Sequence, residues 1–238
     1  MSEWIDEGIV LAVRRHGESN AIVSLLTREH GRHPGLVHGG AGRASRGILQ
    51  PGNQVKATWR ARLAEQLGSL KVELVRDHAG AVMDDADKLA ALASACALSE
   101  AVLPERQPHR AVHEALLALL DAFAAESWPT VYVHWEMALL RALGYGLDLT
   151  CCAATGSNDG LAYVSPRSGR AVSLSAGQPY RDKLLALPRF LVEGGEGDTQ
   201  QILDGLRLTA FFLDRHVLAP HNRLMPAARS RLVDRLLP

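Results

Sequence analysis

The 238-residue sequence has few cysteines, few aromatic residues and no long apolar run. Its three cysteines, Cys96, Cys151 and Cys152, are odd in number and two are adjacent, which argues against a disulfide framework and favours a reducing compartment. The sequence has no stretch of about 18 apolar residues, so we expect no membrane span. The first seven residues are acidic and include no basic segment, so we expect no secretory signal and a cytoplasmic protein.

The sequence also has no net charge at neutral pH, but the charges are unevenly distributed. Residues 1–80 have a balance of +3, residues 81–150 of −6, and residues 151–238 of +3. Between residues 14 and 62 there are nine basic residues and two acidic ones, Glu18 and Glu29. A local excess of this size can attract phosphate groups although the whole chain is neutral.

Five short apolar segments separated by turn residues predict a β-rich N-terminal domain at residues 1–80. The segments leave no room for the helical crossovers that a parallel sheet needs, so we expect a small Greek-key barrel. A glycine-rich basic loop, residues 39–47, separates the third and fourth segments and is expected to be mobile. The expected strands are 8–13, 21–27, 35–38, 55–62 and 68–75.

From about residue 83 the apolar residues recur at helical spacing and predict an all-α domain, residues 81–238. Asp84, Asp85 and Asp87 are typical of a helix start. Residues 150–177 are rich in glycine and serine and predict a loop or small hairpin. The remaining expected helices are 109–125, one from Pro129 to Gly144, 179–193, 198–219 and 226–237.

No motif of the sequence builds a convincing active site. The glycine-rich loop is not followed by Gly-Lys-Ser/Thr, so it is not a P-loop. Cys151 and Cys152 have no downstream cysteine pair and no nearby histidine, so we interpret them as two loop thiols. Histidines 30, 33 and 38 are interpreted as turn residues that add to the basic loop, because no carboxylate cluster accompanies them. We therefore expect neither an enzyme nor a cofactor or metal.

The basic residues of the β-rich domain are the candidate phosphate contacts. Any one of them alone is most simply a solvated charge, but as a group they favour a groove that follows a nucleic-acid backbone. Trp4 and Trp59 are the only tryptophans before residue 128, and Trp59 has the parity of a core residue, so we expect backbone contacts and little base stacking. The candidates are Arg14, Arg15, Arg28, Arg32, Arg43, Arg46, Lys56, Arg60 and Arg62.

The sequence resembles the bacterial RecO family of DNA repair proteins over nearly its whole length. The segments that carry the resemblance are Gly8–Leu11, His16–Glu18, Leu25–Thr27 with His30–Arg32, Leu49–Gly52 and Trp135–Leu149. The resemblance implies an OB-fold N-terminal domain and a helical C-terminal domain. It implies binding of single- and double-stranded DNA, annealing of complementary strands, and loading of the RecA recombinase onto DNA coated by single-strand-binding protein (SSB), on the bacterial nucleoid.

The implied partners are the acidic C-terminal tail of SSB and the RecR protein, with functional links to RecA and RecF. A groove for the SSB tail needs apolar pockets and a cation, and Leu139, Arg141 and Leu143 are candidates for it. Arg141 is equally well explained as an ordinary helix-surface arginine. The alternative function is a helical protein-docking adaptor that binds DNA only incidentally.

Many relatives are expected to carry a four-cysteine zinc module within the helical domain, and this sequence departs from that pattern. Cys152 matches the first cysteine, whereas Thr155, Ser173 and Ala176 stand where the other three would be. With one candidate ligand left, we predict no zinc. Residues 150–177 must then be held by packing and hydrogen bonds, with Tyr163, Val164 and Val172 as candidates.

Overall fold

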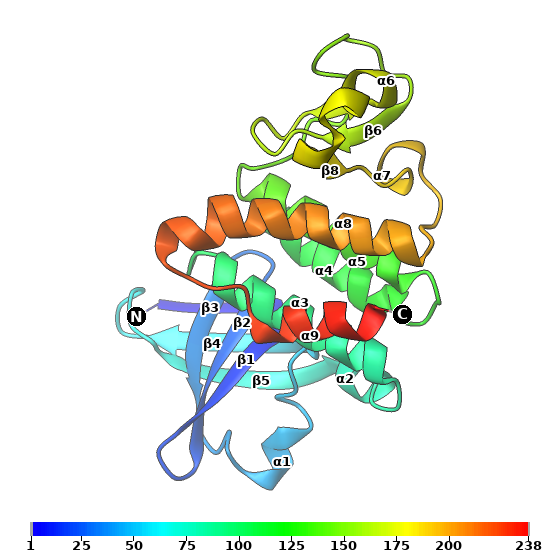
Figure 1. Cartoon of the computed structure of the whole chain (residues 1–238). Coiled ribbons are helices and arrows are strands. Elements are labelled where there is room, and N and C mark those ends of the chain that lie inside the picture. The colour runs from blue at the N-terminus through cyan, green and yellow to red at the C-terminus, as the bar shows by residue number, and fades with distance from the viewer. Residues whose placement is uncertain (1, 238) are drawn as a thin grey trace. The chain divides into compact units, whose positions relative to one another are not determined.

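The structure, a computed structural model, describes residues 2–237, with strands in the N-terminal third and mostly helices thereafter (Figure 1). It divides into two compact units. The first holds residues 2–121 together with Pro226–Leu232, and the second holds residues 122–225 together with 233–237. The change from strands to helices comes after Arg76, whereas the first compact unit continues through two further long helices.

Five strands of the first unit form a closed barrel in the order β1-β2-β3-β5-β4. The neighbours pair antiparallel except β3 and β5, which are parallel and meet at Leu36 and Ser69. The predicted β-rich barrel at the N-terminus is therefore present, although β1 and β3 begin earlier than predicted. The strands are β1 Ser2–His16, β2 Asn20–Thr27, β3 Gly31–Val37, β4 Gln54–Ala61 and β5 Ser69–Arg76.

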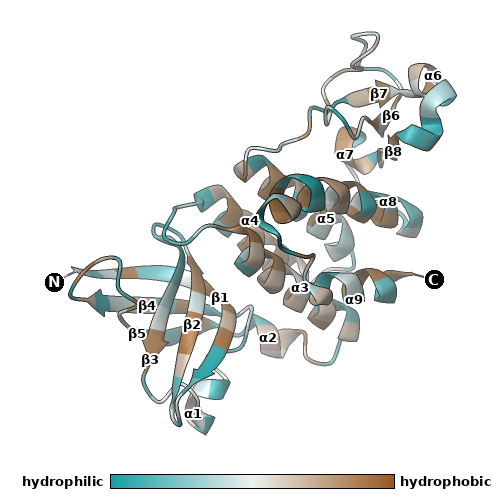
Figure 2. Ribbon diagram, turned by 60° about the vertical axis from the view of Figure 1, so that its left-hand side comes forward, coloured by the Kyte–Doolittle hydropathy of each residue, from teal (hydrophilic) through white to brown (hydrophobic). Residues whose placement is uncertain are grey.

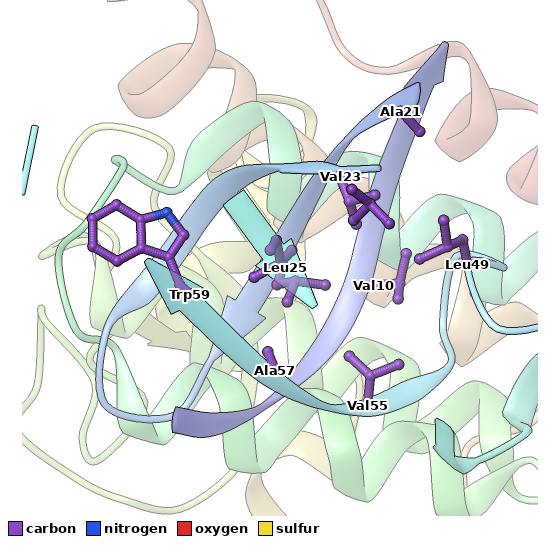
Figure 3. Close-up of a cluster of buried hydrophobic side chains, with 10 residues drawn as sticks. Val10, Ala21, Val23, Leu25, Leu49, Val55, Ala57 and Trp59 are labelled. Atoms are coloured by element: carbon purple, nitrogen blue, oxygen red, sulfur yellow. The ribbon is translucent and has the colours of Figure 1, made fainter. Parts of the chain in front are cut away.

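The barrel encloses a core of apolar side chains that point inward from several strands (Figure 3). Along β4 the inward side chains Val55, Ala57 and Trp59 alternate with the exposed Lys56 and Arg60, as a strand with one buried face requires. The same alternation of hydrophobic and hydrophilic residues is visible along the barrel strands in Figure 2. Trp59 is 1% exposed, so its prediction as a core residue is confirmed.

The turn between β2 and β3 requires a glycine. Gly31 has φ +67°, and a Cβ built on it would lie 1.9 Å from the carbonyl oxygen of Gln107. Arg106, beside Gln107, donates its backbone N–H to the carbonyl of Arg32 at 2.8 Å. The segment after the first long helix is thereby fixed against the start of β3.

The two long helices of the first unit, α3 and α4, lie where the sequence predicts helices. The Asp85 carboxylate accepts hydrogen bonds from the backbone N–H groups of Asp87 and Lys88, both at 3.1 Å, so the predicted helix start is confirmed. The glycine-rich segment, which is predicted as a loop, contains one helical turn. The helices are α1 Arg43–Arg46, α2 His78–Ala81, α3 Ala86–Val102 and α4 Arg110–Ala122.

The second unit combines helices with a three-stranded sheet in the order β7-β6-β8. The predicted hairpin at 150–177 is present as β6 and β7, and it gains a third strand beyond the predicted range. The predicted helix 179–193 is wrong, because Pro188 and the short β8 divide that segment into separate single turns. The strands are β6 Leu161–Val164, β7 Ala171–Ser173 and β8 Leu185–Ala186.

The long helices α5 and α8 form the framework of this unit, and both lie where the sequence predicts them. Helix α8 continues into a π-helical segment, η2, and a short 3-10 turn, η3. No helix among residues 2–237 is long and apolar enough to cross a membrane. The remaining elements are α5 Trp128–Ala142, α6 Leu174–Gly177, η1 Gln178–Lys183, α7 Phe190–Glu193, α8 Thr199–Phe212, η2 Leu213–Leu218, η3 Ala219–His221 and α9 Ala227–Leu236.

Candidate nucleic-acid interface

The hairpin between β1 and β2 carries the first pair of predicted basic residues. Arg14 and Arg15 are exposed near the end of β1, and the Arg15 guanidinium donates to the backbone carbonyl of Glu18 at 2.9 Å. That bond uses a carbonyl and not a carboxylate, so the charge of Arg15 is not neutralised by it. Cationic side chains in this state remain available to phosphate oxygens.

The segment around α1 lies beside this hairpin and carries the second pair. The backbone N–H of Ala41 donates to the carbonyl of Ser19 at 2.9 Å, and that of Gly39 donates to the side-chain oxygen of Asn20 at 3.1 Å. At Gly40 a Cβ would lie only 2.9 Å from the Ala21 side chain, so a larger residue would separate the two segments. Figures 1 and 2 both show α1 and the tip of the β1–β2 hairpin at the same end of the barrel.

These contacts bring four predicted residues together, and we call the set Arg14, Arg15, Arg43 and Arg46 the basic end. All four side chains belong to exposed residues. Among the described residues none of the four forms an ion pair with a carboxylate. Glu18 is the only acidic residue between positions 8 and 28, and none lies between 30 and 64. The basic end therefore has an excess of positive charge, with four arginines against Glu18.

The outer face formed by β1, β4 and β5 is different, because its basic residues have acidic neighbours. The Arg60 guanidinium lies 2.7 Å from the Glu3 carboxylate. Lys56 is placed between Glu7 on β1 and Glu73 on β5 by the strand register. This face has little net charge, so the strands do not bring Lys56 and Arg60 to the basic end. Arg62 is exposed just beyond β4.

Two further predicted residues are occupied by other contacts. Arg32 is 9% exposed; its Nε donates to the carbonyl of Leu103 at 2.8 Å, and its terminal nitrogen lies 3.2 Å from Glu100 and 3.4 Å from Glu105. A buried and doubly paired guanidinium cannot reach a phosphate, so Arg32 has to be removed from the predicted set. Arg28 is exposed but pairs with Glu114 at 3.4 Å.

Two of the three histidines assigned to the basic loop lie elsewhere. His30 stacks on Trp4 with ring centroids 4.3 Å apart, and His33 packs edge-on against Trp59 at 4.8 Å. Burial lowers the pKa of His33 to about 4, helped by the charges of Arg106 and His30, so this ring is neutral at physiological pH. Only His38 is exposed beside the basic end.

A groove of about 410 Å³ in the second unit contains Arg141, the predicted cation for an acidic peptide. Its walls combine apolar side chains, among them Met137, Leu147, Leu191 and Val192, with the polar residues His134, Asp148 and Thr150. Arg141 is exposed and forms no ion pair within residues 2–237. A free guanidinium among apolar side chains has the chemistry to bind a carboxylate attached to an apolar segment.

The other two residues predicted to line that groove, Leu139 and Leu143, do not line it. Leu139 is fully buried in the core of the unit, and Leu143 is not among the residues of the groove. Asp148 also lines the groove, but Arg170 lies 3.3 Å from its carboxylate and compensates the negative charge. Hydrogen bonds from Thr150, assisted by Arg170, lower the pKa of Asp148.

The segment expected to replace a zinc module is held by hydrogen bonds to a single thiol. Cys152 is 1% exposed, and its Sγ accepts the backbone N–H of Ser173 at 3.3 Å. The Cys152 thiol also accepts hydrogen bonds from the side chains of Ser173 and Thr155 and from the backbone N–H of Ala154. Together these bonds lower the pKa of Cys152 to about 6. Cys152, which is predicted as a plain loop thiol, is therefore a buried and hydrogen-bonded one.

This donor set does not fit a structural zinc ion. Such sites use four Cys or His ligands, and here hydroxyl groups stand beside the only matching thiol. Within residues 2–237 no three side chains of His, Cys, Asp or Glu gather in a way that could hold a metal ion. Tyr163, Val164 and Val172 lie in the β6–β7 pairing, where the sequence analysis placed the packing of this segment.

Two family models together match most of the chain. Residues 1–77 match the N-terminal model of recombination protein O, and residues 83–225 match the C-terminal model. The chain belongs to the RecO family. The two models meet at residues 77–83, the point where the barrel gives way to helices.

Relatives of the RecO family are similar along the full chain. The protein named DNA repair protein RecO from Rhodospirillum centenum is 57% identical and covers 98% of this chain and 94% of its own. That from Rhodospirillum rubrum is 56% identical with coverage of 99% and 97%, and one from Methylorubrum extorquens is 50% identical with coverage of 97% and 97%. The family likeness predicted from short segments is therefore confirmed.

Proposed function

We propose that this RecO-family chain is a DNA repair protein that acts without a catalytic site of its own, as a recombination mediator in the cytoplasm on the bacterial nucleoid. It binds single- and double-stranded DNA, anneals complementary strands and, with RecR, helps load RecA onto SSB-coated DNA. The observation that carries the proposal is the basic end, where the fold gathers four arginines with no carboxylate partner among the described residues. The names of the full-length relatives support the repair role.

We infer that the barrel is an OB fold. Its strand order and its closure between β3 and β5 support this inference, since an OB fold is a five-stranded Greek-key barrel that commonly binds oligonucleotides. In many single-strand binders, aromatic rings on the barrel stack with bases. Here Trp59 is buried and the Trp4 ring lies against His30, so binding relies on phosphate neutralisation and is insensitive to base sequence.

Phosphate neutralisation also accounts for annealing. Two complementary strands repel each other through their backbones, and a protein that covers the phosphates with arginines lowers that repulsion. Base edges that are not held by aromatic residues remain free to pair with the second strand. A binder with little stacking is therefore better suited to annealing than one that holds each base.

We propose that the groove around Arg141 binds the acidic C-terminal tail of SSB. The guanidinium of Arg141 pairs with a carboxylate of the tail, and the apolar side chains of Met137, Leu147 and Leu191 receive its apolar residues. Binding of SSB through this groove brings the basic end to DNA that SSB occupies. RecR, RecA and RecF act with the chain on that DNA.

The test of DNA binding is the salt dependence of affinity for a labelled oligothymidylate. A variant with all four arginines of the basic end changed to alanine should lose most of its affinity, and its log–log salt slope should shrink by about 0.7 per lost phosphate contact. The matched control changes Arg60 and Lys56 to alanine on the charge-balanced face, and its slope should stay close to wild type. An unchanged slope in the fourfold variant would refute the proposed surface.

A helical docking adaptor with incidental DNA binding is the second candidate, and the Arg141 groove is the observation that favours it. An SSB tail peptide separates the two functions. Arg141→Ala should abolish peptide binding and leave oligothymidylate affinity unchanged. Strong peptide binding in a protein whose DNA affinity ignores the basic end would make the adaptor the correct function.

A further inference from the structure

A small cavity of about 210 Å³ in the second unit has an aromatic and basic lining that the proposed contacts do not use. Tyr145, Phe212 and His216 supply its rings, Arg167 supplies its charge, and three glycines complete much of the wall. No acidic residue of the described chain lines it. This composition differs from that of the Arg141 groove, which has aliphatic side chains in place of the stacked rings and includes Asp148.

The three rings form a continuous stack. Phe212 and His216 have centroids 5.8 Å apart with an angle of 11° between their planes, and His216 and Tyr145 are 5.3 Å apart at 22°. Phe212 is 3% exposed, whereas Tyr145 is 42% exposed. The stack therefore begins in the core and ends in an exposed, nearly parallel ring.

The π-helical segment η2 positions the middle ring of this stack. It follows directly from α8, and within it His216 lies four residues after Phe212, with the two rings almost parallel. Segments of this type are rare and are frequent at functional sites. A core that needed only apolar packing would be served by continuing the α-helix.

The charge around the stack is positive. Arg167 is exposed and Arg215 lies over the ring of Phe211 at 5.7 Å, and neither forms an ion pair within residues 2–237. Asp148 nearby in sequence is compensated by Arg170. Asp214 is the one acidic residue in η2, and it is exposed.

We propose that this cavity binds one nucleotide of single-stranded DNA, with the base stacked on Tyr145 and the phosphate paired with Arg167. The proposal rests on the DNA binding proposed above and adds a base contact that the barrel lacks. An exposed ring at the end of an ordered stack is suited to a flat π-surface, and an unpaired arginine beside it is suited to a phosphate. A peptide occupant with a carboxylate would find better apolar contacts in the Arg141 groove.

The experiment uses the full chain and two labelled probes, an oligothymidylate and an oligomer of the same length with abasic sites. Wild type should bind the oligothymidylate roughly 5- to 10-fold more tightly, because stacking needs a base. Tyr145→Ala should remove that difference, and Tyr145→Phe should keep it. Tyr180→Ala, which removes another exposed tyrosine of the same unit, is the matched control and should behave like wild type.

Arg167→Ala reports on the phosphate contact separately, and should weaken both probes equally while the salt slope falls by about 0.7. Circular dichroism of each variant verifies folding. A base preference that survives Tyr145→Ala would overturn the proposal, as would a loss confined to binding of the SSB tail. If the fourfold variant of the basic end binds DNA like wild type, the proposed DNA surface of the barrel is wrong. That result is independent of whether Tyr145→Ala keeps or loses the preference for a base.

Discussion

The backbone N–H of Gly39 donates a hydrogen bond of 3.1 Å to the side-chain oxygen of Asn20. This bond joins the start of β2 to the loop that carries α1, so it helps hold Arg43 and Arg46 near Arg14 and Arg15. The affinity of the basic end for phosphate thus depends on a neutral residue that contacts no DNA. Charges that are held together in advance lose less conformational entropy on binding than charges on separate mobile segments.

Asn20→Ala should therefore weaken DNA binding without removing any charge. A hydrogen bond of this kind contributes about 0.5–1.5 kcal/mol, so a loop that is released by its loss and must be ordered again on binding corresponds to roughly a 2- to 10-fold loss of affinity. The log–log salt slope should remain that of wild type, since every arginine is retained. Asn158→Ala, at an exposed asparagine of the second unit, is the control. Wild-type affinity in folded Asn20→Ala would show that the loop needs no such anchor.

Substitutions of Arg32 and Arg43 should have opposite effects, because Arg32→Ala should lower stability and Arg43→Ala should lower DNA affinity. Arg32 is buried between Glu100 and the carbonyl of Leu103, so Arg32→Ala leaves the Glu100 carboxylate without its cation and with only the Ser24 hydroxyl as partner, and should lower the free energy of unfolding by about 2–4 kcal/mol. Arg43→Ala removes an exposed charge and should change stability by less than about 0.5 kcal/mol. Urea denaturation measures the first effect, and the salt slope for oligothymidylate measures the second. Equal stabilities would contradict the structural role of Arg32.

The strands of the barrel and the start of α3 could be predicted because each depends on local pattern. Alternating apolar residues identify β4, and Asp85 identifies the N-cap of α3. The segment 179–193 could not be predicted in the same way. Its apolar residues allow a helix, but the pairing of β8 with β6, which no local signal announces, decides its conformation.

The candidate site was predictable as a group and not residue by residue. The sequence identifies an excess of arginine, but Arg32 and Arg43 look alike until the partner of Arg32, Glu100, is placed 68 residues away along the chain. Arg141 illustrates the same limit. Helical spacing places it beside Leu139, yet only the packing of α5 shows that Leu139 faces the core while Arg141 faces a groove.

His33 should make the folded barrel sensitive to acid. Its pKa falls to about 4 in the fold, mainly because of burial, while the ordinary value is 6.5. A base whose pKa is lowered in the fold contributes stability at pH values above its pKa in the unfolded chain. This contribution is lost as pH falls from about 6.5 towards 4, because the unfolded chain takes up the proton first. The urea midpoint should therefore drop between pH 7.5 and pH 5. In His33→Phe that drop should be smaller, and an equal drop would assign the acid sensitivity to other groups.

Removal of metal should leave the second unit unchanged. Cys152 is surrounded by hydroxyl and backbone N–H groups, so no site of four strong ligands exists among the described residues for a chelator to empty. Thermal unfolding with and without excess EDTA should give the same midpoint. Added zinc should not raise the midpoint either, and a rise of several degrees would show a ligand set that the fold does not present.

Hydrogen bonds hold the thiol of Cys152 in its thiolate form. The side chain of Ser173 is the largest cause of its lowered pKa, followed by that of Thr155. Ser173→Ala should therefore move the pKa from about 6 towards the ordinary value of 9.0. Thiolate absorbance in the ultraviolet measures this pKa directly when it is followed against pH in a background with Cys96 and Cys151 changed to serine.

Because a lowered thiol pKa contributes stability that is lost as pH falls through about 6, Ser173→Ala should also be most destabilised, relative to its parent, at alkaline pH. Titration at the same pH in both proteins would mean that the Ser173 hydroxyl does not hold the thiolate.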